Sequence, residues 1–381
     1  MAKFTEETPC VAYRNYSVPM STAQLALFAS KERLGKSEGV AAEWGLRTFE
    51  LGNRRYLGGK SKLIGFIESE TQAALGRMPR SIFDVFAGTG VVAQHFHNKG
   101  IPIVASDLLR HNYLGLTCFM GPQKLNLNVL AEKIVHLSKL RAKKNYFSEN
   151  FGGTYFSLDN AKKIGSIREE IEQISTSQRE RAALITSLIY AADRVANTVG
   201  HYDAFHRGQN IETPIELKFP LIGDISSRNN EVYCEDSTRI AAGVTTEVAY
   251  LDPPYNSRQY SDAYHLLENL AEWQKPEVEG VAKKMDRTHL KSDFCGKSAP
   301  EAFEELIGEL NTDLIIMSYN NTSDSLNARS NAAISDEEII DTLRLRGTVT
   351  VRETAFNSFT TGKTKKRPHT ERLFVCKVKN K

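Results

Sequence analysis

The chain has 381 residues, of which 41% are hydrophobic, 9% aromatic and 25% charged. This balance is typical of a globular protein with a large core, and it excludes disordered, collagen-like and membrane-embedded chains. The net charge is +3, but residues 361–381 carry eight Lys or Arg against one Glu, which leaves −4 for the rest of the chain. A basic segment on a nearly neutral body favours contact with a polyanion, although a solvated basic tail explains it equally well.

The N-terminus and the cysteines indicate the compartment. The first ten residues include acidic side chains where a signal peptide has a basic and then an apolar stretch, and no apolar run reaches the length of a membrane span, so we expect a cytoplasmic protein. The five cysteines are scattered without a C-x-x-C pair, and no H-E-x-x-H pattern occurs. We therefore expect reduced thiols and no metal site. Residues 1–50 form an N-terminal extension to which the sequence assigns no structure.

From residue 81 the pattern is strand, glycine turn, helix and strand. The apolar segment 81–86 leads into Ala87–Gly90, residues 91–99 have a helical pattern, and the strand-like segment 101–106 ends before Asp107. This order is the βαβ signature of a doubly wound sheet.

Residues 111–225 change character and predict a helical insertion. Three helices are expected there, over Val129–Lys144, Asp159–Ile174 and Gln178–Val199. Strand-like segments then return at Glu231–Cys234, Glu247–Leu251 and Asp313–Ser318. We therefore expect one α/β domain, residues 51–110 and 226–381, that is split in sequence by the insertion.

The C-terminal part predicts a helix and a hairpin. The segment from Ser335 to Glu338 predicts a capping box for a helix over Glu337–Arg344, and Thr348–Thr354 and Arg372–Lys379 alternate like paired strands. Four cations stand in the loop between these strands: Lys363, Lys365, Lys366 and Arg367. We expect them to contact DNA phosphates without reading bases, the alternative being a solvated hairpin tip.

The turn from Asp84 to Gly90 suits a ligand near the start of a helix. Its glycines allow close approach to the backbone, and the helix N-terminus points at the ligand. It lacks a third glycine and the Lys-Ser/Thr pair of a phosphate loop, so a nucleoside triphosphate is not expected. Asp107, at the end of the next strand, is placed to bind a ribose diol. Its alternative role is that of a helix cap.

The segment Asp252-Pro253-Pro254-Tyr255 directly follows an apolar strand. Two prolines stiffen the turn and hold a carboxylate and a carbonyl at the carboxyl edge of the sheet. An extruded base needs acceptors for its exocyclic amino group and an aromatic face for its ring, and this segment supplies both. A plain loop turn is the alternative.

Taken in order, these segments resemble the Dam-like, alpha-order adenine-N6 DNA methyltransferases, in the version found in restriction-modification systems and phages. The resemblance covers most of residues 54–378 and is closest over 252–260 and 264–270. It implies a methyltransferase, Rossmann-like, mostly parallel sheet and S-adenosylmethionine as cofactor. The cofactor residues that it implies are Tyr56, Gly59, Lys60, Asp84, Phe86, Ala87, Gly88, Thr89, Gly90, Asp107, Asp236 and Ser237.

The resemblance also assigns the DNA side. The insertion becomes the target-recognition region, Arg258 and Tyr260 are expected to contact DNA, and the segment 197–205 is expected to lie near it. Within that segment, Tyr202 and Phe205 are equally well explained as core aromatics.

The function expected is methyl transfer to the N6 amino group of adenine in duplex DNA, with base flipping. Asp252 and the Pro253 carbonyl would hold the amino hydrogens while Tyr255 stacks on the ring, without metal or covalent intermediate. Methylation of adenine in RNA, and a catalytically silent DNA-binding protein, remain as alternatives. A cognate restriction endonuclease is a possible partner. The sequence determines neither the recognition site nor the oligomeric state.

Overall fold

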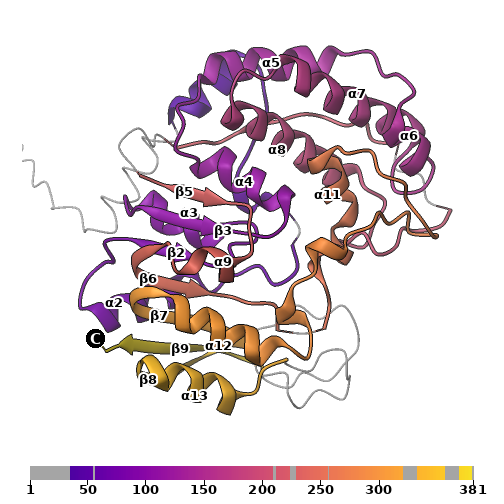
Figure 1. Ribbon diagram of the computed structural model, residues 1–381. Helices are drawn as coiled ribbons and strands as arrows, with labels where there is room; N and C mark the ends of the chain where they lie inside the picture. Colours follow the sequence, from indigo (N-terminus) through magenta and orange to yellow (C-terminus); the bar gives the residue numbers. More distant parts are fainter. Residues whose placement is uncertain are drawn as a thin grey trace, which may run out of the picture.

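The computed structural model describes residues 35–54, 56–208, 212–223, 229–255, 257–320, 333–356 and 369–379. A seven-stranded sheet, in the order β5-β3-β2-β6-β7-β9-β8, lies beside a group of helices (Figure 1). The strands of this sheet are β2 (Ile82–Asp84), β3 (Ile103–Ser106), β5 (Glu231–Tyr233), β6 (Thr245–Leu251), β7 (Asn311–Asn320), β8 (Gly347–Phe356) and β9 (His369–Val378). All neighbours are parallel except β9, which is antiparallel to both β7 and β8.

The sheet is buried on both faces, and successive residues of its strands enter two different cores. In β6, Val248 and Tyr250 belong to one hydrophobic cluster, whereas Ala249 and Leu251 belong to the other. This alternation follows from the two-residue period of a strand, and burial of both faces explains why these strands are almost continuously apolar.

Helices cover the two faces separately. α2 (Ile64–Leu75) and α3 (Val91–Asn98) contribute to the first cluster. α9 (Ser237–Ala241), α12 (Ala299–Glu309) and α13 (Asp336–Arg346) contribute to the second. The predicted doubly wound, mostly parallel sheet is thus confirmed, with helices on both sides.

The helical group packs directly onto the first face, because the first cluster runs on into it. Its helices are α4 (Arg110–Met120), α5 (Leu127–Lys139), α6 (Tyr146–Phe151), α7 (Leu158–Ile174) and α8 (Gln178–Val195), with α10 (Tyr260–Ala263) and α11 (His265–Glu272) joining it later in the chain. The buried Arg168 of α7 donates to the carbonyls of Leu270 (2.7 Å) and Ala271 (3.1 Å), which satisfies the end of α11. A small parallel pair, β1 (Thr48–Phe49) and β4 (Phe219–Pro220), lies outside the main sheet.

Most predicted elements are confirmed, but two helices end early. The helix predicted to reach Lys144 ends at Lys139, because Asn145 and Ser148 form a capping box that starts α6. The helix predicted to reach Val199 ends at Val195, and the Asn197 amide then donates to the carbonyls of Thr154 and His206. The helices α2, α4, α6 and α12 were not predicted.

The helix and the hairpin predicted for the C-terminal part are confirmed. Ser335 and Glu338 form the predicted capping box, and β8 pairs with β9 in register from Gly347 opposite Val378 to Phe356 opposite His369. The four cations of the connecting loop, Lys363, Lys365, Lys366 and Arg367, lie outside the described residues.

Candidate active site

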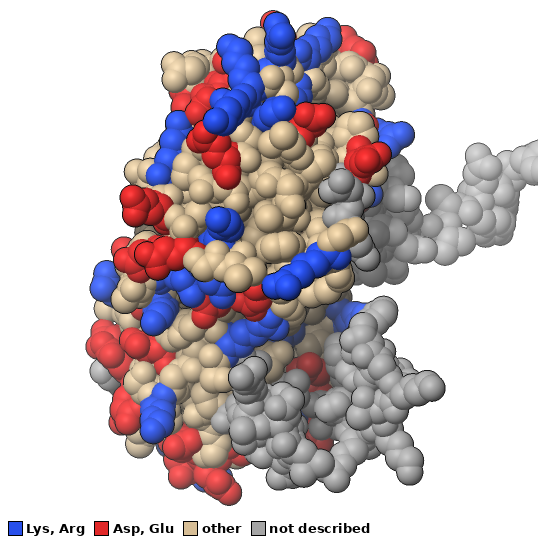
Figure 2. All heavy atoms as spheres, turned by 90° about the vertical axis from the view of Figure 1, so that its right-hand side faces the viewer, with Lys and Arg blue, Asp and Glu red and all other residues tan. Residues whose placement is uncertain are grey.

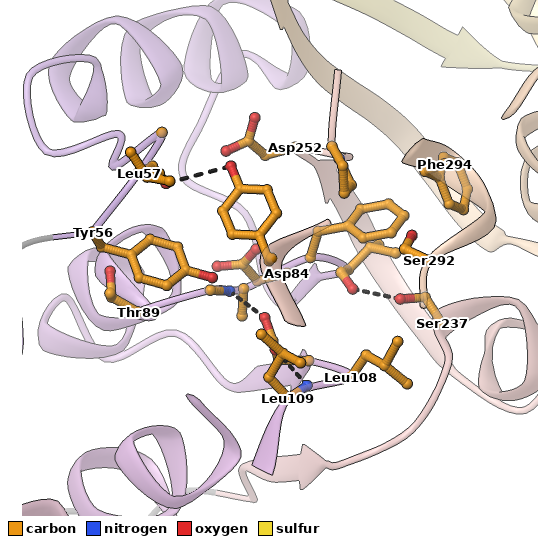
Figure 3. A pocket seen from close by; sticks show the side chains of 18 of the residues that line it. Tyr56, Leu57, Asp84, Thr89, Leu108, Leu109, Ser237, Asp252, Ser292 and Phe294 are labelled. Carbon is orange, nitrogen blue, oxygen red and sulfur yellow. Dashed lines mark hydrogen bonds between the residues drawn. The ribbon is translucent and has the colours of Figure 1, made fainter. Parts of the chain in front are cut away.

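A cleft opens where the parallel strands β2, β3 and β6 end. The strand order runs from β2 through β3 to β5 in one direction and from β6 to β7 in the other, so the chain changes direction between β2 and β6. Ligands of open α/β sheets bind at such a switch point, outside the carboxyl ends of the strands. The cleft has an open volume of about 950 Å³, including its solvent side. Figure 3 shows Asp84, Asp252, Tyr56 and Thr89 arranged around it.

The wall of this cleft collects most of the predicted cofactor residues. Lining residues that the sequence singled out are Tyr56, Gly59, Lys60, Asp84, Phe86, Ala87, Gly88, Thr89, Asp107, Asp236, Ser237, Asp252, Pro254 and Tyr260. Gly90, Pro253, Tyr255 and Arg258 are not among the residues that line it.

The two glycines of the turn after β2 serve different purposes. Gly88 has φ +53° and lines the cleft, and a Cβ there would lie 3.2 Å from Cε1 of Tyr56. Gly90 has φ +83°, and a Cβ there would lie 2.4 Å from Cδ2 of Leu116 in α4. Gly88 therefore keeps the approach to the turn open, whereas Gly90 is required by the packing of α3 against α4.

Asp84 is a buried carboxyl at the end of β2. Its Oδ2 accepts a hydrogen bond from the backbone N–H of Ala93 in α3 (3.0 Å), and the residue is 1% exposed. Burial raises the pKa of Asp84 to about 8; the bond from Ala93 opposes this, while the charges of Asp252 and Asp107 add to it. The carboxyl is therefore protonated at neutral pH, and a cation in the cleft would favour its ionised form.

Asp107 is held by three donors from both sides of the cleft. Its Oδ2 accepts from Gly88 N (2.8 Å) and its Oδ1 from Leu109 N (2.8 Å) and Asn112 Nδ2 (3.1 Å). The same amide of Asn112 also donates to the Tyr56 hydroxyl (2.9 Å). Asp107 thus shapes the turn before α4 and lines the cleft, but the N-cap of α4 is Leu109, so Asp107 is not the helix cap; its role toward a ribose stays a prediction. Burial raises the pKa of Asp107 to about 7.

A buried pair fixes the position of α4. The carboxylate of Glu268 in α11 accepts from the backbone N–H groups of Arg110 and His111 and from Nδ1 of His111 (2.5 Å). Both side chains are fully buried. Because Asn112 stands in the first turn of α4, Glu268 indirectly sets the place of the amide that holds Asp107 and Tyr56.

Asp252 ends β6 on the opposite side of the cleft from Asp107. Its Oδ1 lies 2.9 Å from Nζ of Lys60 and accepts a hydrogen bond from the Ser318 hydroxyl (3.0 Å). Burial alone would lower the pKa of Lys60, but Asp252 and Glu371 outweigh it and raise the pKa, so Lys60 is charged. Both of these contacts use Oδ1.

The two residues on either side of Pro254 stand outside the cleft wall. Pro253 is buried, and the Tyr255 ring packs against Tyr319 with its centroid 6.4 Å away. Nζ of Lys60 lies 5.8 Å from the Tyr255 centroid, so Lys60 is close to both Asp252 and Tyr255. Asp252 therefore lines the cleft, whereas the Tyr255 ring lies outside its wall.

Asp236 and Ser237 lie at the start of α9. Asp236 is the N-cap of this helix and accepts from Thr238 N (3.0 Å) and Oγ1 (2.8 Å), while the Ser237 hydroxyl donates to the Val85 carbonyl (2.6 Å). Both residues line the cleft.

The two predicted DNA residues after the Asp-Pro-Pro-Tyr turn separate in space. Tyr260 is part of the cleft wall and stacks on Tyr56, with ring centroids 5.6 Å apart. Arg258 points elsewhere and forms an ion pair with Asp203 (2.6 Å).

Several lining residues were not predicted. Leu108 and Leu109 come from the turn after Asp107, Gln259 follows Arg258, and Ser292 and Phe294 come from the irregular stretch after α11. Leu108, Leu109 and Gln259 stand beside predicted residues in the sequence, and this nearness could have indicated that they line the cleft. Ser292 and Phe294 had no such signal, because their stretch has no regular period and reaches the cleft only through the fold.

Residues 56–309 match the family described as D12 class N6 adenine-specific DNA methyltransferase. The chain belongs to this family. It is 31% identical over 310 residues to the modification methylase StsI of Streptococcus sanguinis, and 31% identical over 281 residues to the Type II methyltransferase M.NlaIII of Neisseria lactamica. These alignments take in 76% and 70% of this chain.

The relatives differ in length. The alignment covers 83% of M.NlaIII but only 46% of StsI, so the chain spans about half the length of the latter. The Type II methyltransferase M.FokI of Planomicrobium okeanokoites, 27% identical over 315 residues, is likewise covered to 47%. Within the described ranges, no helix is both long enough and apolar enough to cross a membrane.

Proposed function

We propose that the protein transfers a methyl group from S-adenosylmethionine to the N6 amino group of adenine in duplex DNA. One observation carries the proposal: Asp252, held by Lys60 and Ser318 at the end of β6, faces the same cleft as Asp84, Gly88 and Asp107. A carboxylate for the amino group and a glycine turn for the donor thus share one site.

The residues of the cleft fit S-adenosylmethionine by their chemistry. Asp84, Asp107 and Asp252 all line the cleft, and a cationic ligand such as a sulfonium would favour the ionised forms of Asp84 and Asp107, whose pKa values burial raises. Asp107 would hold the ribose diol, and the apolar side chains of Leu108 and Phe294 would cover the adenine. When bound, the cofactor supplies a methyl group on a positively charged sulfur.

The protein's part in the reaction is positioning. In the proposed mechanism Oδ2 of Asp252 and the Pro253 carbonyl accept the two amino hydrogens of an extruded adenine, so the nitrogen lone pair points along the cleft. Lys60 and Ser318 hold the carboxylate in place through Oδ1. Asp252 is also the nearest carboxylate to take the proton that the methylated nitrogen releases.

Tyr255 supplies the aromatic face for the base. Its ring lies outside the wall of the cofactor cleft and next to Lys60, which supports a place for the base beside the cofactor and not within its cleft. Stacking on a side chain tolerates any base, so Tyr255 holds adenine while Asp252 and Pro253 select its amino group.

The test measures transfer of a tritiated methyl group to duplex DNA, to single strands and to structured RNA. We expect label in duplex DNA, located at adenine N6 after hydrolysis to nucleosides. If structured RNA is labelled in preference to DNA, RNA is the substrate and the proposal is wrong on this point. Binding of cofactor without transfer to any nucleic acid would indicate a silent DNA-binding protein and overturn the proposal.

The relatives are named modification methylases and Type II methyltransferases, which supports a role in DNA modification, and we propose a cognate restriction endonuclease as the partner. We extend this to the helical region 111–225, which we propose as the part that recognises the target, and to the basic loop with Lys363, Lys365, Lys366 and Arg367, which we propose to contact phosphates. Sequencing modified DNA from cells that express the protein would give the recognised site. Absence of any methylated motif would contradict this role.

A further inference from the structure

Three segments far apart in the sequence meet beside the active site. The segment around Tyr202 is anchored to α10, because Tyr202 N donates to the Ala263 carbonyl (2.7 Å). The Tyr155 hydroxyl lies 2.6 Å from the Tyr202 carbonyl and 3.0 Å from that of Ala282. The third segment, with Arg258, directly follows the Asp-Pro-Pro-Tyr turn.

One carboxylate joins all three segments. Asp203 Oδ2 lies 2.6 Å from Nη2 of Arg258, and its Oδ1 lies 2.9 Å from Nζ of Lys284. Nδ1 of His201 is 3.6 Å from the same carboxylate. Burial opposes ionisation, but the bonds from Arg258 and Lys284 outweigh it and lower the pKa of Asp203, so the group is charged at neutral pH.

This cluster is open to solvent. The side chains of Asp203, Arg258 and Lys284 are 28%, 40% and 25% exposed. Two large apolar side chains on the same loops are also exposed, Val199 to 60% and Val281 to 69%. Figure 2 views the molecule from the side toward which the parallel strands point, and Lys and Arg side chains lie across the middle of that face, mixed with acidic ones. The exposed cations of this face suit the phosphates of duplex DNA.

The cluster also lies next to the cleft. Gln259, the neighbour of Arg258, lines the cleft and exchanges two hydrogen bonds with Ser292, Nε2 to the carbonyl at 3.0 Å and N–H to Oε1 at 2.9 Å. The Cys295 thiol lies 3.5 Å from the Arg258 carbonyl. The backbone under Arg258 is therefore fixed beside the cleft.

We propose that Asp203 takes the place of a DNA phosphate in the free protein and that the duplex displaces it from Arg258 and Lys284. The inference rests on the proposed function, since it assumes DNA as the substrate. A carboxylate between two cations imitates a bridging phosphate in charge and geometry. Because partly exposed ion pairs contribute little, a polyanion that releases counterions on binding competes with them successfully. In the free protein Asp203 keeps both cations ordered and lowers affinity for unrelated polyanions.

The experiment compares Asp203→Asn with Asp341→Asn by fluorescence anisotropy of a short labelled duplex across a salt series. Asp341 is the matched control, because it pairs with Arg344 on α13 and its removal changes the net charge equally. Asp203→Asn should bind the duplex about three- to tenfold more tightly than the wild type at every salt concentration, with the slope of log affinity against log salt unchanged, because Arg258 and Lys284 neutralise the same phosphates in both complexes. Unchanged or weaker binding would overturn the proposal, because an Asp203 that only braces the loops should lose affinity when neutralised.

Two further variants, Lys284→Gln alone and Lys284→Gln combined with Asp203→Asn, keep the proposal testable if Asp203→Asn by itself does not fold. Lys284→Gln should flatten the salt slope by about 0.9, and in that background Asp203→Asn should raise the affinity less than it does alone. An unchanged slope in Lys284→Gln contradicts the proposal. Wild-type methylation of the same DNA is measured in parallel: no methylation means that the proposed function fails, whereas methylation without tighter binding by Asp203→Asn means that only this inference fails.

Discussion

The two halves of the cleft are built in different ways. On the side of β2 and β3, Asp107 is fixed by backbone N–H groups of Gly88 and Leu109, within a short stretch of chain. On the side of β6, Asp252 is fixed by side chains, those of Lys60 and Ser318, from segments 192 and 66 residues away in sequence. The comparison teaches that the donor half depends mostly on backbone N–H groups, with the Asn112 side chain added, whereas the acceptor half depends on polar and charged side chains from distant segments. Substitutions should therefore separate cofactor binding from transfer.

The largest effect is expected from Asp252→Ala. It removes the acceptor for the amino group and should lower kcat by about 100-fold or more, while cofactor affinity stays within a few fold. Single-turnover transfer and calorimetric titration with the cofactor measure the two quantities. Asp341→Ala, on the surface of α13, serves as the control. Retained transfer would remove Asp252 from the mechanism.

Gly88→Ala tests the donor half: it should weaken cofactor binding, whereas Asp252→Ala should weaken transfer and leave cofactor binding almost unchanged. The residue must keep φ +53° and would bring a Cβ to 3.2 Å from Tyr56, so we expect cofactor affinity to fall about tenfold or more. Gly100→Ala is a matched control, because Gly100 has φ +89° but no atom within 4 Å of the added Cβ. It should lose stability but keep cofactor affinity. Equal affinity losses in both variants would show that strain, and not the cleft, is responsible.

Tyr255→Ala should weaken capture of the extruded base by about 1–3 kcal/mol, the usual contribution of base stacking, with cofactor binding unchanged. Tyr255→Phe should keep much of the activity. The measurement is the dependence of single-turnover transfer on DNA concentration. If Phe is as damaging as Ala, the hydroxyl matters and stacking is not the role.

The smallest effect is on stability against pH. The folded-state pKa values of Asp84 and Asp107, about 8 and about 7, lie well above the ordinary value for an aspartic acid. The stability that they contribute is therefore fully present below about pH 4 and is lost as pH rises through 7 and 8, because the unfolded chain has already released these protons. The melting temperature of the free protein should fall by a few degrees over this range, and less so in Asp84→Asn. A flat profile in the wild type would contradict the raised values.

The sequence alone determined the elements whose signals are local. The βαβ unit, the long helices and the Ser335 capping box were predicted because apolar period, glycine turns and caps act over a few residues. The two turns that carry Asp84 and Asp252 could be placed at one sheet edge for the same reason, since parallel strands end together.

The tertiary structure decided which distant side chains meet. Glu268 caps α4 across 158 residues, Phe294 reaches the cleft from an irregular stretch, and Asp203 pairs with Arg258. None of these contacts leaves a period or a turn signature, because each depends on how whole helices and loops pack. The sequence therefore specified the chemistry of the two turns, while packing decided which distant side chains orient them and which cations pair with Asp203.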